Sequence, residues 1–356
     1  MSAHDIQFSP VHRIDLPRIV LVGQNVLDNL GEICNELGYG RAIIVSGRTT
    51  FQVAGKRAHE VMAAKGIDST YVFADDAQLE TVNRIIEDTK THDASVVVGV
   101  GGGRSIDVAK LAAAKTKGCF ISVPTVSSHD GIASSLASIK GVERPYTMRA
   151  VSPIAVIMDS KIIAESPYRF TASGSGDIVS KITEVEDWKL SHRENGEYYG
   201  AYAGSLALMS SQLVMENAED IHKKTDDGIR ILLEALISCG VSMSIAGSSR
   251  PCSGSAHLFS HALDIIAKTP ALHGEQCGVG SILMAKLHGF NWEYIRDRLK
   301  IIGAPINAKE LHVTNEEVIE SLVQARGVRP ERFTILNKIK LDYRKAESLA
   351  KECLVI

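Results

Sequence analysis

Three histidines and an aspartate stand out as candidate metal ligands. The histidines are His257, His261 and His273, and Asp177 lies eighty residues before the first of them, in the segment Gly-Ser-Gly-Asp-Ile. Neutral imidazoles together with a carboxylate form the ligand set of a catalytic zinc, which keeps a coordination position open for substrate or water. These residues therefore predict a metal-dependent enzyme.

The glycine-rich segment at residues 98–107 is a second candidate site. It passes from an apolar, strand-like run through Gly101, Gly102 and Gly103 into an expected helix. Main-chain N–H groups in such a turn can approach a phosphate closely, and the start of the helix adds partial positive charge. The usual dinucleotide motif is not reproduced, because Arg104 follows the glycines and the turn comes after the fourth expected strand. We predict a pyrophosphate site; tight packing of strand on helix is the alternative.

A polar loop at residues 122–131 is a third candidate. It leaves an expected strand through a proline and then presents a run of hydroxyl and ionisable side chains that ends at Asp130. Hydroxyl-rich loops at the carboxyl ends of parallel strands line ligand crevices. An ordinary polar loop with Asx-type turns fits the same residues.

The elements that must position these residues follow two patterns. Up to about residue 160, strand-like and helix-like segments alternate, as in an α/β domain with a largely parallel sheet. Beyond about residue 161 the pattern is helical. We expect a nucleotide-binding α/β domain at residues 1–160 and a helical metal and substrate domain at residues 161–356. The expected strands lie at 19–22, 42–45, 69–74, 95–100, 120–123 and 155–158.

The composition narrows the class of protein. A formal net charge of -3 lacks the basic excess of a nucleic-acid binder. The six cysteines are scattered with no C-x-x-C pair, which fits a reducing, cytoplasmic setting. No continuous apolar run of about 18 residues occurs, so no membrane insertion is expected. We therefore expect a small-molecule substrate and no nucleic-acid partner.

Together these motifs are similar to the iron- and zinc-dependent polyol dehydrogenase superfamily, and within it to the archaeal-type sn-glycerol-1-phosphate dehydrogenases. The resemblance implies a Rossmann-like parallel-sheet domain followed by an all-helical metal-binding domain, the dehydroquinate synthase-like fold. It also implies assembly into a homo-oligomer, a dimer or a higher ring. The segments that carry it are residues 101–107, 122–134, 173–177, 249–264 and 272–278.

The resemblance assigns the metal ligands. It implies Asp177, His257 and His273 as ligands, with His261 close to the site; spacing alone would place both His257 and His261 on one helix face as ligands. Iron-type relatives have a further histidine four residues after the aspartate, where this chain has Lys181. This difference favours a three-ligand zinc site, although ligand type alone leaves nickel and iron open.

The resemblance also implies the reaction. Dihydroxyacetone phosphate would be reduced to sn-glycerol 1-phosphate, the first step towards the phospholipid backbone of archaeal membranes. Zinc would polarise the substrate carbonyl while a nicotinamide supplies hydride. Asp130 matches a residue that contacts substrate hydroxyls in similar enzymes, and either His261 or a water held by the zinc is a candidate proton relay. We expect the substrate phosphate to bind Arg250, Ser253 and Ser255; a surface role is the alternative for Arg250.

The cofactor is expected to be NADH or NADPH. An NAD-specific enzyme often has an acidic residue at the end of the second strand, where this chain reads Ser-Gly-Arg-Thr at residues 46–49. With no carboxylate in this segment, and with Arg48 able to attract a 2′-phosphate, NADP(H) should be accepted. The expected cofactor contacts are Gly47, Arg48, Gly101, Gly102, Gly103, Ser105, Asp107, Thr125 and Ser128.

Three other functions compete with this interpretation. A glycerol dehydrogenase would act on unphosphorylated polyols with NAD and would lack the block at residues 250–255. A dehydroquinate-synthase-like cyclase shares the fold and a His-Gly-Glu segment, but it uses a glutamate as first metal ligand, and Asp177 argues against it. A binding protein that had lost the chemistry would not be expected to keep the whole ligand set.

Overall fold

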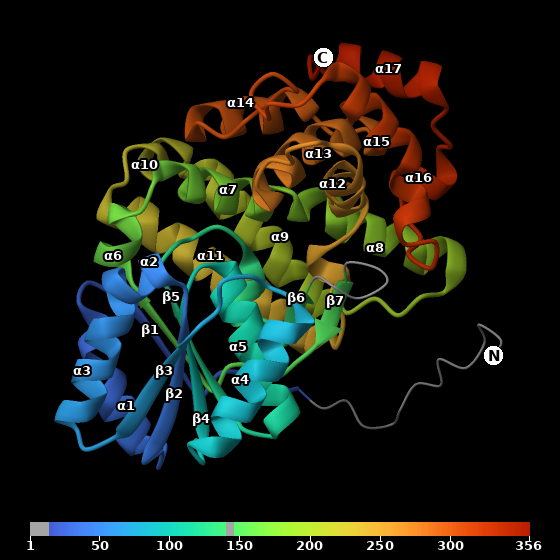
Figure 1. Cartoon of the computed structure of the whole chain (residues 1–356). Coiled ribbons are helices and arrows are strands. Elements are labelled where there is room, and N and C mark those ends of the chain that lie inside the picture. Colours follow the sequence, from blue (N-terminus) through green and yellow to red (C-terminus); the bar gives the residue numbers. More distant parts are fainter. Residues whose placement is uncertain (1–13, 140–145) are drawn as a thin grey trace, which may run out of the picture.

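A parallel β-sheet forms the core of the N-terminal half in the computed structural model, which describes residues 14–139 and 146–356 (Figure 1). The strand order is β1-β8-β5-β4-β2-β3, and each neighbouring pair is parallel. All six strands lie where the sequence predicts them. They are β1 (Ile19–Gly23), β2 (Arg41–Ser46), β3 (Asp68–Phe73), β4 (Val96–Gly101), β5 (Cys119–Pro124) and β8 (Ala155–Asp159).

Helices cover both faces of this sheet. One face packs on α1 (Leu30–Glu36) and α3 (Lys56–Ala64), and the other on α4 (Leu79–Thr91) and α5 (Gly103–Thr116). The central strand β4 is buried along its whole length, as a strand enclosed by two helical layers must be. The helical segment between β2 and β3 is divided into α2 (Arg48–Thr50), a π-helical turn (Phe51–Gly55) and α3.

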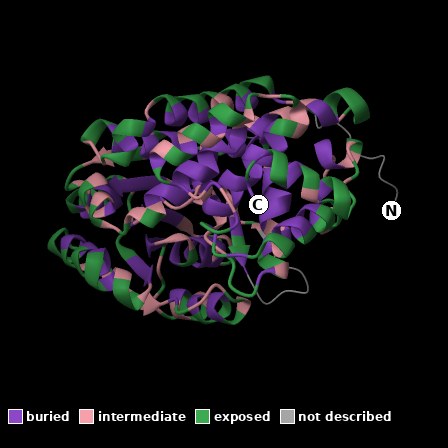
Figure 2. Cartoon of the chain, turned by 90° about the horizontal axis from the view of Figure 1, so that it is seen from above, coloured by how far each residue is buried: buried purple, intermediate pink, exposed green. Residues whose placement is uncertain are grey.

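The chain from Ser160 onwards is helical, as predicted. Buried residues run through the interior of this half and exposed residues line its outside (Figure 2). The helices are α6 (Ser160–Glu165), α7 (Tyr168–Val179), α8 (Lys181–Asn195), α9 (Ala201–Glu216), α10 (Ala218–His222), α11 (Asp226–Ala246), α12 (Ser255–Ile266), α13 (His273–His288), α14 (Trp292–Ile302), α15 (Asn315–Val328), α16 (Ile335–Lys338) and α17 (Tyr343–Glu352).

A short antiparallel hairpin follows the polar loop and was not expected. It pairs β6 (Leu136–Ile139) with β7 (Tyr146–Arg149). The fully buried ammonium of Lys110 on α5 holds its base by donating hydrogen bonds to the carbonyl oxygens of Gly131 and Leu136. Strands of four residues are too short for alternation to reveal them, and this contact is non-local.

Helix α11 is long and apolar enough to cross a membrane by length and composition. Most of its apolar stretch is buried inside the protein, where it packs against α9. The apolar composition is therefore accounted for by a place in the core of the helical half.

Candidate active site

A cavity of about 890 Å³ runs from the carboxyl edge of the sheet to the helical half. At one end lie the end of β2 and the glycine turn before α5, and at the other lie Ser173 and His273. The cavity therefore joins the two sites that the sequence predicts separately. Of the expected cofactor contacts, those that line it are Gly47, Arg48, Gly102, Gly103, Ser105, Thr125 and Ser128.

The glycine turn has space only for glycine at two positions. Gly101 has φ +151°, and a Cβ there would approach the Ser105 side chain at 2.9 Å. A Cβ on Gly103, the first residue of α5, would overlap the imidazole of His129. The turn thus exposes main-chain N–H groups and a helix N-terminus to the cavity, which is an arrangement suited to a pyrophosphate.

His129 closes the cavity above this turn, and sequence reasoning assigned it no role. Its Nδ1 accepts the main-chain N–H of Gly131 at 2.9 Å. The neutral ring therefore carries its proton on Nε2, on the side that covers Gly103. This N–H is available as a donor to a ligand in the cavity.

A carboxylate lies beside Arg48 after all. Asp75 follows β3, and because β3 pairs with β2 it meets Arg48, with 3.2 Å between Arg48 Nε and Asp75 Oδ1. Arg104 donates to the main-chain oxygen of Asp75 at 2.8 Å. All three residues line the cavity. Residues 46–49 contain no acidic residue, as the sequence shows, but the folded chain brings the carboxylate of Asp75 to the same place.

Asp107, an expected cofactor contact, does not line the cavity. It is buried, and its Oδ2 accepts the main-chain N–H of Ser138 at 3.1 Å, while Oδ1 lies 3.5 Å from Lys110 Nζ. Its carboxylate therefore ties α5 to the hairpin. The Asp107 carboxylate lies outside the cavity lining, in the interior next to the hairpin.

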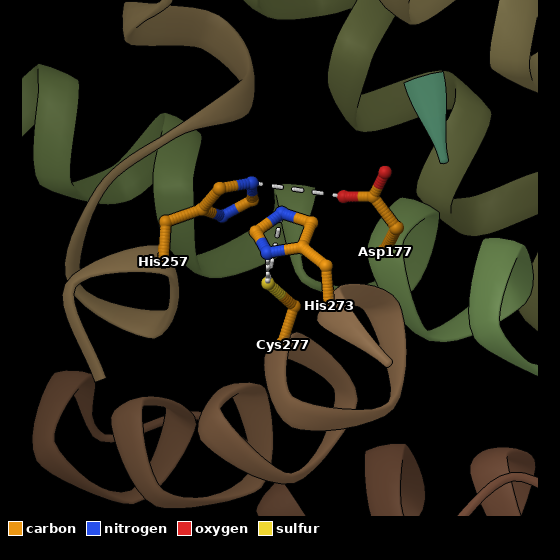
Figure 3. A group of neighbouring side chains, drawn as sticks. All are labelled: Asp177, His257, His273 and Cys277. Atoms are coloured by element: carbon orange, nitrogen blue, oxygen red, sulfur yellow. Dashed lines mark hydrogen bonds and ion pairs between the residues drawn. The ribbon is translucent and has the colours of Figure 1, made fainter. Parts of the chain in front are cut away.

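The expected metal ligands converge from three helices. Asp177 lies near the end of α7, His257 in the first turn of α12, and His273 opens α13; Cys277 joins them one turn later. One ligand-type atom from each of the four lies within 4.8 Å of all the others. Figure 3 shows His257 and Asp177 facing each other, with the ring of His273 between them and Cys277 beside that ring. The site fits a zinc ion, which prefers nitrogen, sulfur and carboxylate donors.

Glu184 on α8 orients the first histidine. Its Oε1 accepts both the main-chain N–H of His257 at 3.1 Å and the ring Nδ1–H at 2.7 Å. Burial raises the pKa of Glu184 well above its usual range; with the proton of the neutral acid on Oε2, Oε1 still accepts both N–H groups. The lone pair of His257 is therefore on Nε2, 3.7 Å from Asp177 Oδ1.

Ser260 performs the same task for the second histidine. It donates its one proton to Gln276 Oε1 at 2.9 Å, while the Gln276 amide nitrogen donates to Asp264 at 3.0 Å. The Ser260 oxygen is then an acceptor for His273 Nδ1–H at 3.1 Å. His273 consequently presents the lone pair of Nε2, as a metal ligand must.

Lys181 lies against Asp177 and is fully buried. Its ammonium contacts Asp177 Oδ1 at 2.5 Å, Asp130 Oδ2 at 2.9 Å and the Cys252 carbonyl at 3.2 Å. Burial alone would raise the pKa of Asp177, but Lys181 and His273 outweigh it and hold this pKa below its usual value. Lys181 therefore keeps the ligand ionised, and as an ammonium it has no lone pair for a metal.

Asp130 lies behind the ligand rather than in the cavity. Its main-chain N–H donates to Asp177 Oδ2 at 2.9 Å, and its carboxylate faces Lys181. Burial, followed by the charge of Asp177, raises the pKa of Asp130. Asp130 thus contacts the metal ligand Asp177 directly but would not itself touch the metal.

His261 lies next to the ligand histidines, as expected. Its ring stacks on His273 with centroids 5.8 Å apart. Burial and the neighbouring His273 lower the pKa of His261 to about 3, so the ring is neutral at physiological pH.

Known proteins resemble this chain over nearly its full length. Residues 21–167 match the family model "Iron-containing alcohol dehydrogenase". The glycerol-1-phosphate dehydrogenase [NAD(P)+] of Methanosarcina mazei is 49% identical over 344 residues, which cover 96% of both chains. That of Thermococcus kodakarensis is 48% identical over 342 residues, covering 96% of this chain and 97% of the other. The chain belongs to the glycerol-1-phosphate dehydrogenase family.

Solved structures share the fold of this family member at low identity. A glycerol dehydrogenase from Schizosaccharomyces pombe superposes with a TM-score of 0.79 at 18% identity and covers 97% of this chain and 91% of the other. A sulfoacetaldehyde reductase from Bifidobacterium kashiwanohense, solved with NAD⁺, gives a TM-score of 0.74 at 17% identity, covering 97% of this chain and 99% of the other. The expected fold class is confirmed.

Arg250, the expected phosphate ligand of this dehydrogenase, faces away from the cavity. It is buried, and its Nη2 lies 3.1 Å from Glu197 Oε2 and donates to the Phe333 carbonyl at 3.0 Å. Ser255, at the start of α12, is fully buried, and its main-chain N–H donates to Asp187 at 2.6 Å. These contacts join α8, α12 and the segment before α16.

Arg332 is the more accessible guanidinium of the same cluster, and sequence reasoning missed it. It is half-buried and donates to the Ser249 hydroxyl at 2.8 Å and to the Ser253 carbonyl. The positive charge of Arg332 helps to lower the pKa values of His257 and His261. Arg332 therefore lies close to the metal ligands. The Ser253 segment thus does border the ligand set, but through Arg332.

Proposed function

We propose that this family member reduces dihydroxyacetone phosphate to sn-glycerol 1-phosphate, with NADPH or NADH as hydride donor and a zinc ion as Lewis acid. The observation that carries the proposal is the single cavity that leads from the glycine turn to His273. A dinucleotide whose pyrophosphate lies at the turn would extend its nicotinamide towards the metal ligands. The family membership supports the substrate.

Asp177, His257 and His273 would hold the zinc, which when bound supplies a positive charge that polarises the substrate carbonyl. Glu184 and Ser260 fix the tautomers of the two histidines. Lys181 keeps Asp177 ionised and immobile. Each ligand is therefore set in place before any ion binds, so little reorganisation is needed on binding.

The proton that reaches the product oxygen is assigned to His261 or to a water held by the zinc, and Asp130 is assigned to the substrate hydroxyls, as the sequence suggests. A pKa of about 3 makes His261 a neutral ring, which can pass a proton from solvent while it accepts another. Asp130 lies one contact from the metal ligands, because its main-chain N–H donates to Asp177 Oδ2 at 2.9 Å.

The substrate phosphate is assigned to the cluster around Arg332, with Ser253, Ser255 and Arg250 behind it. Among the ion pairs of residues 14–139 and 146–356, Arg250 has a carboxylate partner in Glu197, whereas Arg332 bonds to a hydroxyl and a carbonyl, neither of them charged. An anion beside Arg332 would therefore meet a guanidinium that has no carboxylate in direct contact among the described residues, although the charges of Glu184 and Glu197 act on it from further away.

For localisation, assembly and domain division we propose what the sequence predicts. The described cysteines are all free, which supports a reducing cytoplasm. Tyr202, Met209 and Leu213 leave an exposed apolar stripe on α9, which supports a homo-oligomer. Residues 1–160 would form the nucleotide-binding domain and 161–356 the metal and substrate domain, with the cavity between them.

Comparing phosphorylated and free substrates tests the proposal. Zinc-loaded protein should oxidise NADPH when given dihydroxyacetone phosphate, and far more slowly with dihydroxyacetone. Protein stripped of metal by a chelator should be inactive until zinc is restored. An equal or higher kcat/KM for dihydroxyacetone would instead identify a polyol dehydrogenase, the function named for the Schizosaccharomyces pombe structure.

A further inference from the structure

Cys277 lies at the metal ligands but belongs to no role described so far. It follows His273 by four residues on α13, so both side chains project from one face of the helix. The thiol is completely buried. Its Sγ lies 3.5 Å from His273 Nε2, the nitrogen with the free lone pair, and 3.9 Å from Nδ1 (Figure 3).

The separation of sulfur and nitrogen fits a shared metal ion. Zinc–nitrogen bonds of about 2.0–2.1 Å and zinc–sulfur bonds of about 2.3 Å at a tetrahedral angle put the two donor atoms roughly 3.5 Å apart. The 3.5 Å between Cys277 Sγ and His273 Nε2 matches this value. The donor atoms of Asp177 and His257 lie within 4.8 Å of both.

The backbone holds this thiol in place. A Cβ on Gly176 of α7 would collide with the carbonyl of Gly274, and one on Gly274 would collide with the carbonyl of Ser173. The two helices therefore touch through their main chains, beside Asp177 on one helix and His273 and Cys277 on the other. The main chain at Cys277 therefore cannot move away from Asp177 without separating α7 from α13.

We propose that Cys277 is a fourth protein donor to the metal ion, so that the site is an aspartate, two histidines and a thiolate, and the substrate carbonyl would bind as a fifth ligand. The role of Cys277 rests on the proposed function in one respect only, namely that the protein binds a metal ion. Coordination replaces the S–H bond with a sulfur–metal bond and releases the proton to buffer. A thiolate donor selects zinc and cobalt over hard ions such as magnesium and manganese.

A second buried group, Asp130 with Cys239 and Cys252, could also offer sulfur to a metal. In this group the Cys252 sulfur already has partners, because it lies 3.3 Å from the Ser242 hydroxyl and 3.5 Å from the Cys239 carbonyl oxygen, and no histidine joins the group. Cys252 is therefore a matched control: a buried cysteine near the same ligands but outside the proposed set.

Cobalt(II) loaded into the full-length protein tests the assignment by spectroscopy. Wild-type protein and Cys252→Ser should show the near-ultraviolet band of thiolate-to-cobalt charge transfer, and Cys277→Ser should lose it. The zinc dissociation constant of Cys277→Ser should rise by at least the 10- to 100-fold typical of losing an outer partner, about one to two decades. A band that survives in Cys277→Ser, or that vanishes only in Cys252→Ser, overturns the proposal.

X-ray absorption of the zinc-loaded wild type gives an answer even if Cys277→Ser does not fold. The proposal requires one sulfur scatterer at about 2.3 Å from zinc. A first shell of nitrogen and oxygen alone rejects it. Because neither readout involves dihydroxyacetone phosphate, protein that reduces this substrate but lacks zinc–sulfur scattering would disprove the role of Cys277 and leave the proposed function intact.

Discussion

Each ligand histidine is fixed by a different kind of partner. Glu184 accepts from His257 at 2.7 Å, whereas Ser260 accepts from His273 at 3.1 Å because its own proton goes to Gln276. A buried carboxylate and a hydroxyl that is fixed as an acceptor have the same effect, since each leaves Nε2 unprotonated. Metal affinity should therefore depend on residues that never touch the metal.

Replacing Glu184 tests this dependence. Glu184→Ala should weaken zinc binding by about 10- to 100-fold, because His257 loses the acceptor that fixes its ring. Glu184→Gln keeps an acceptor oxygen and should recover most of the affinity. Competition with a zinc-binding dye measures both. Glu194→Ala, on the same helix but exposed, is the control; equal losses in both alanine variants would contradict an orienting role.

If Arg332 binds the substrate phosphate, its removal should weaken substrate binding. Arg332→Ala should raise KM for dihydroxyacetone phosphate by about 10- to 100-fold, since a hydrogen bond to a charged group contributes about 1.5–3 kcal/mol. Arg250→Ala, which breaks contacts to Glu197 and Phe333, should chiefly lower stability. Steady-state kinetics with both substrates decides the matter. The assignment fails if Arg332→Ala impairs dihydroxyacetone to the same degree.

At the scale of elements, parallel pairing determines what surrounds the cofactor. Strands β2 and β3 run side by side with Ser46 opposite Phe73, so the residues just beyond each strand meet at the cavity. Arg48 and Asp75 form their ion pair there. The strand order therefore supplies a carboxylate that the local sequence of β2 lacks.

Removing this carboxylate should change cofactor preference. In Asp75→Asn the negative charge that would repel a 2′-phosphate is lost and Arg48 is released, so the ratio of kcat/KM for NADPH over NADH should rise. An exposed ion pair contributes up to about 1 kcal/mol, which corresponds to about fivefold. Asp93→Asn removes another exposed arginine partner, at the opposite edge of the sheet, and should leave the ratio unchanged. A fall in the ratio would show that Asp75 does not face the ribose.

Elements with strong local patterns could be predicted, and contacts between distant elements could not. The buried valines of β4 and the glycines after it identify strand, turn and helix from sequence. The i, i+4 spacing of His273 and Cys277 is also present in the sequence, and it could have identified Cys277 as a neighbour of the metal ligands. Glu184, Asp75 and Arg332 carried no signal, because each reaches its site only after the helices or strands pack together. Asp107 was misassigned since its carboxylate turns towards the hairpin.

At the scale of the whole molecule, the metal-free protein buries histidines that cannot accept protons. Burial lowers the pKa of His257 well below its usual value, and burial with His273 lowers that of His261 to about 3. The unfolded chain binds these protons below pH of about 6.5 while the folded protein does not. Acid therefore favours the unfolded state in the range between those values.

In the metal-free protein the contribution of these two histidines to stability should consequently fall as pH falls from about 6.5 to about 5, while Glu184 and Asp130, with raised pKa values, contribute in the opposite direction. Each buried histidine contributes up to about 1.4 kcal/mol per pH unit to this loss. Urea unfolding at several pH values measures it. His261→Gln should reduce the slope, while the exposed His192→Gln should not. A slope that is the same in wild type and His261→Gln would mean that His261 is protonated in the folded protein.

The chirality of the product tests the central claim most directly. Zinc-loaded protein is incubated with NADPH and dihydroxyacetone phosphate, and the product is offered to an oxidase specific for sn-glycerol 3-phosphate. The account predicts that cofactor is consumed and that the oxidase leaves the product untouched, because the phosphate is on sn-1. Oxidation of the product, or no consumption of NADPH or NADH by the metal-loaded protein, would contradict it.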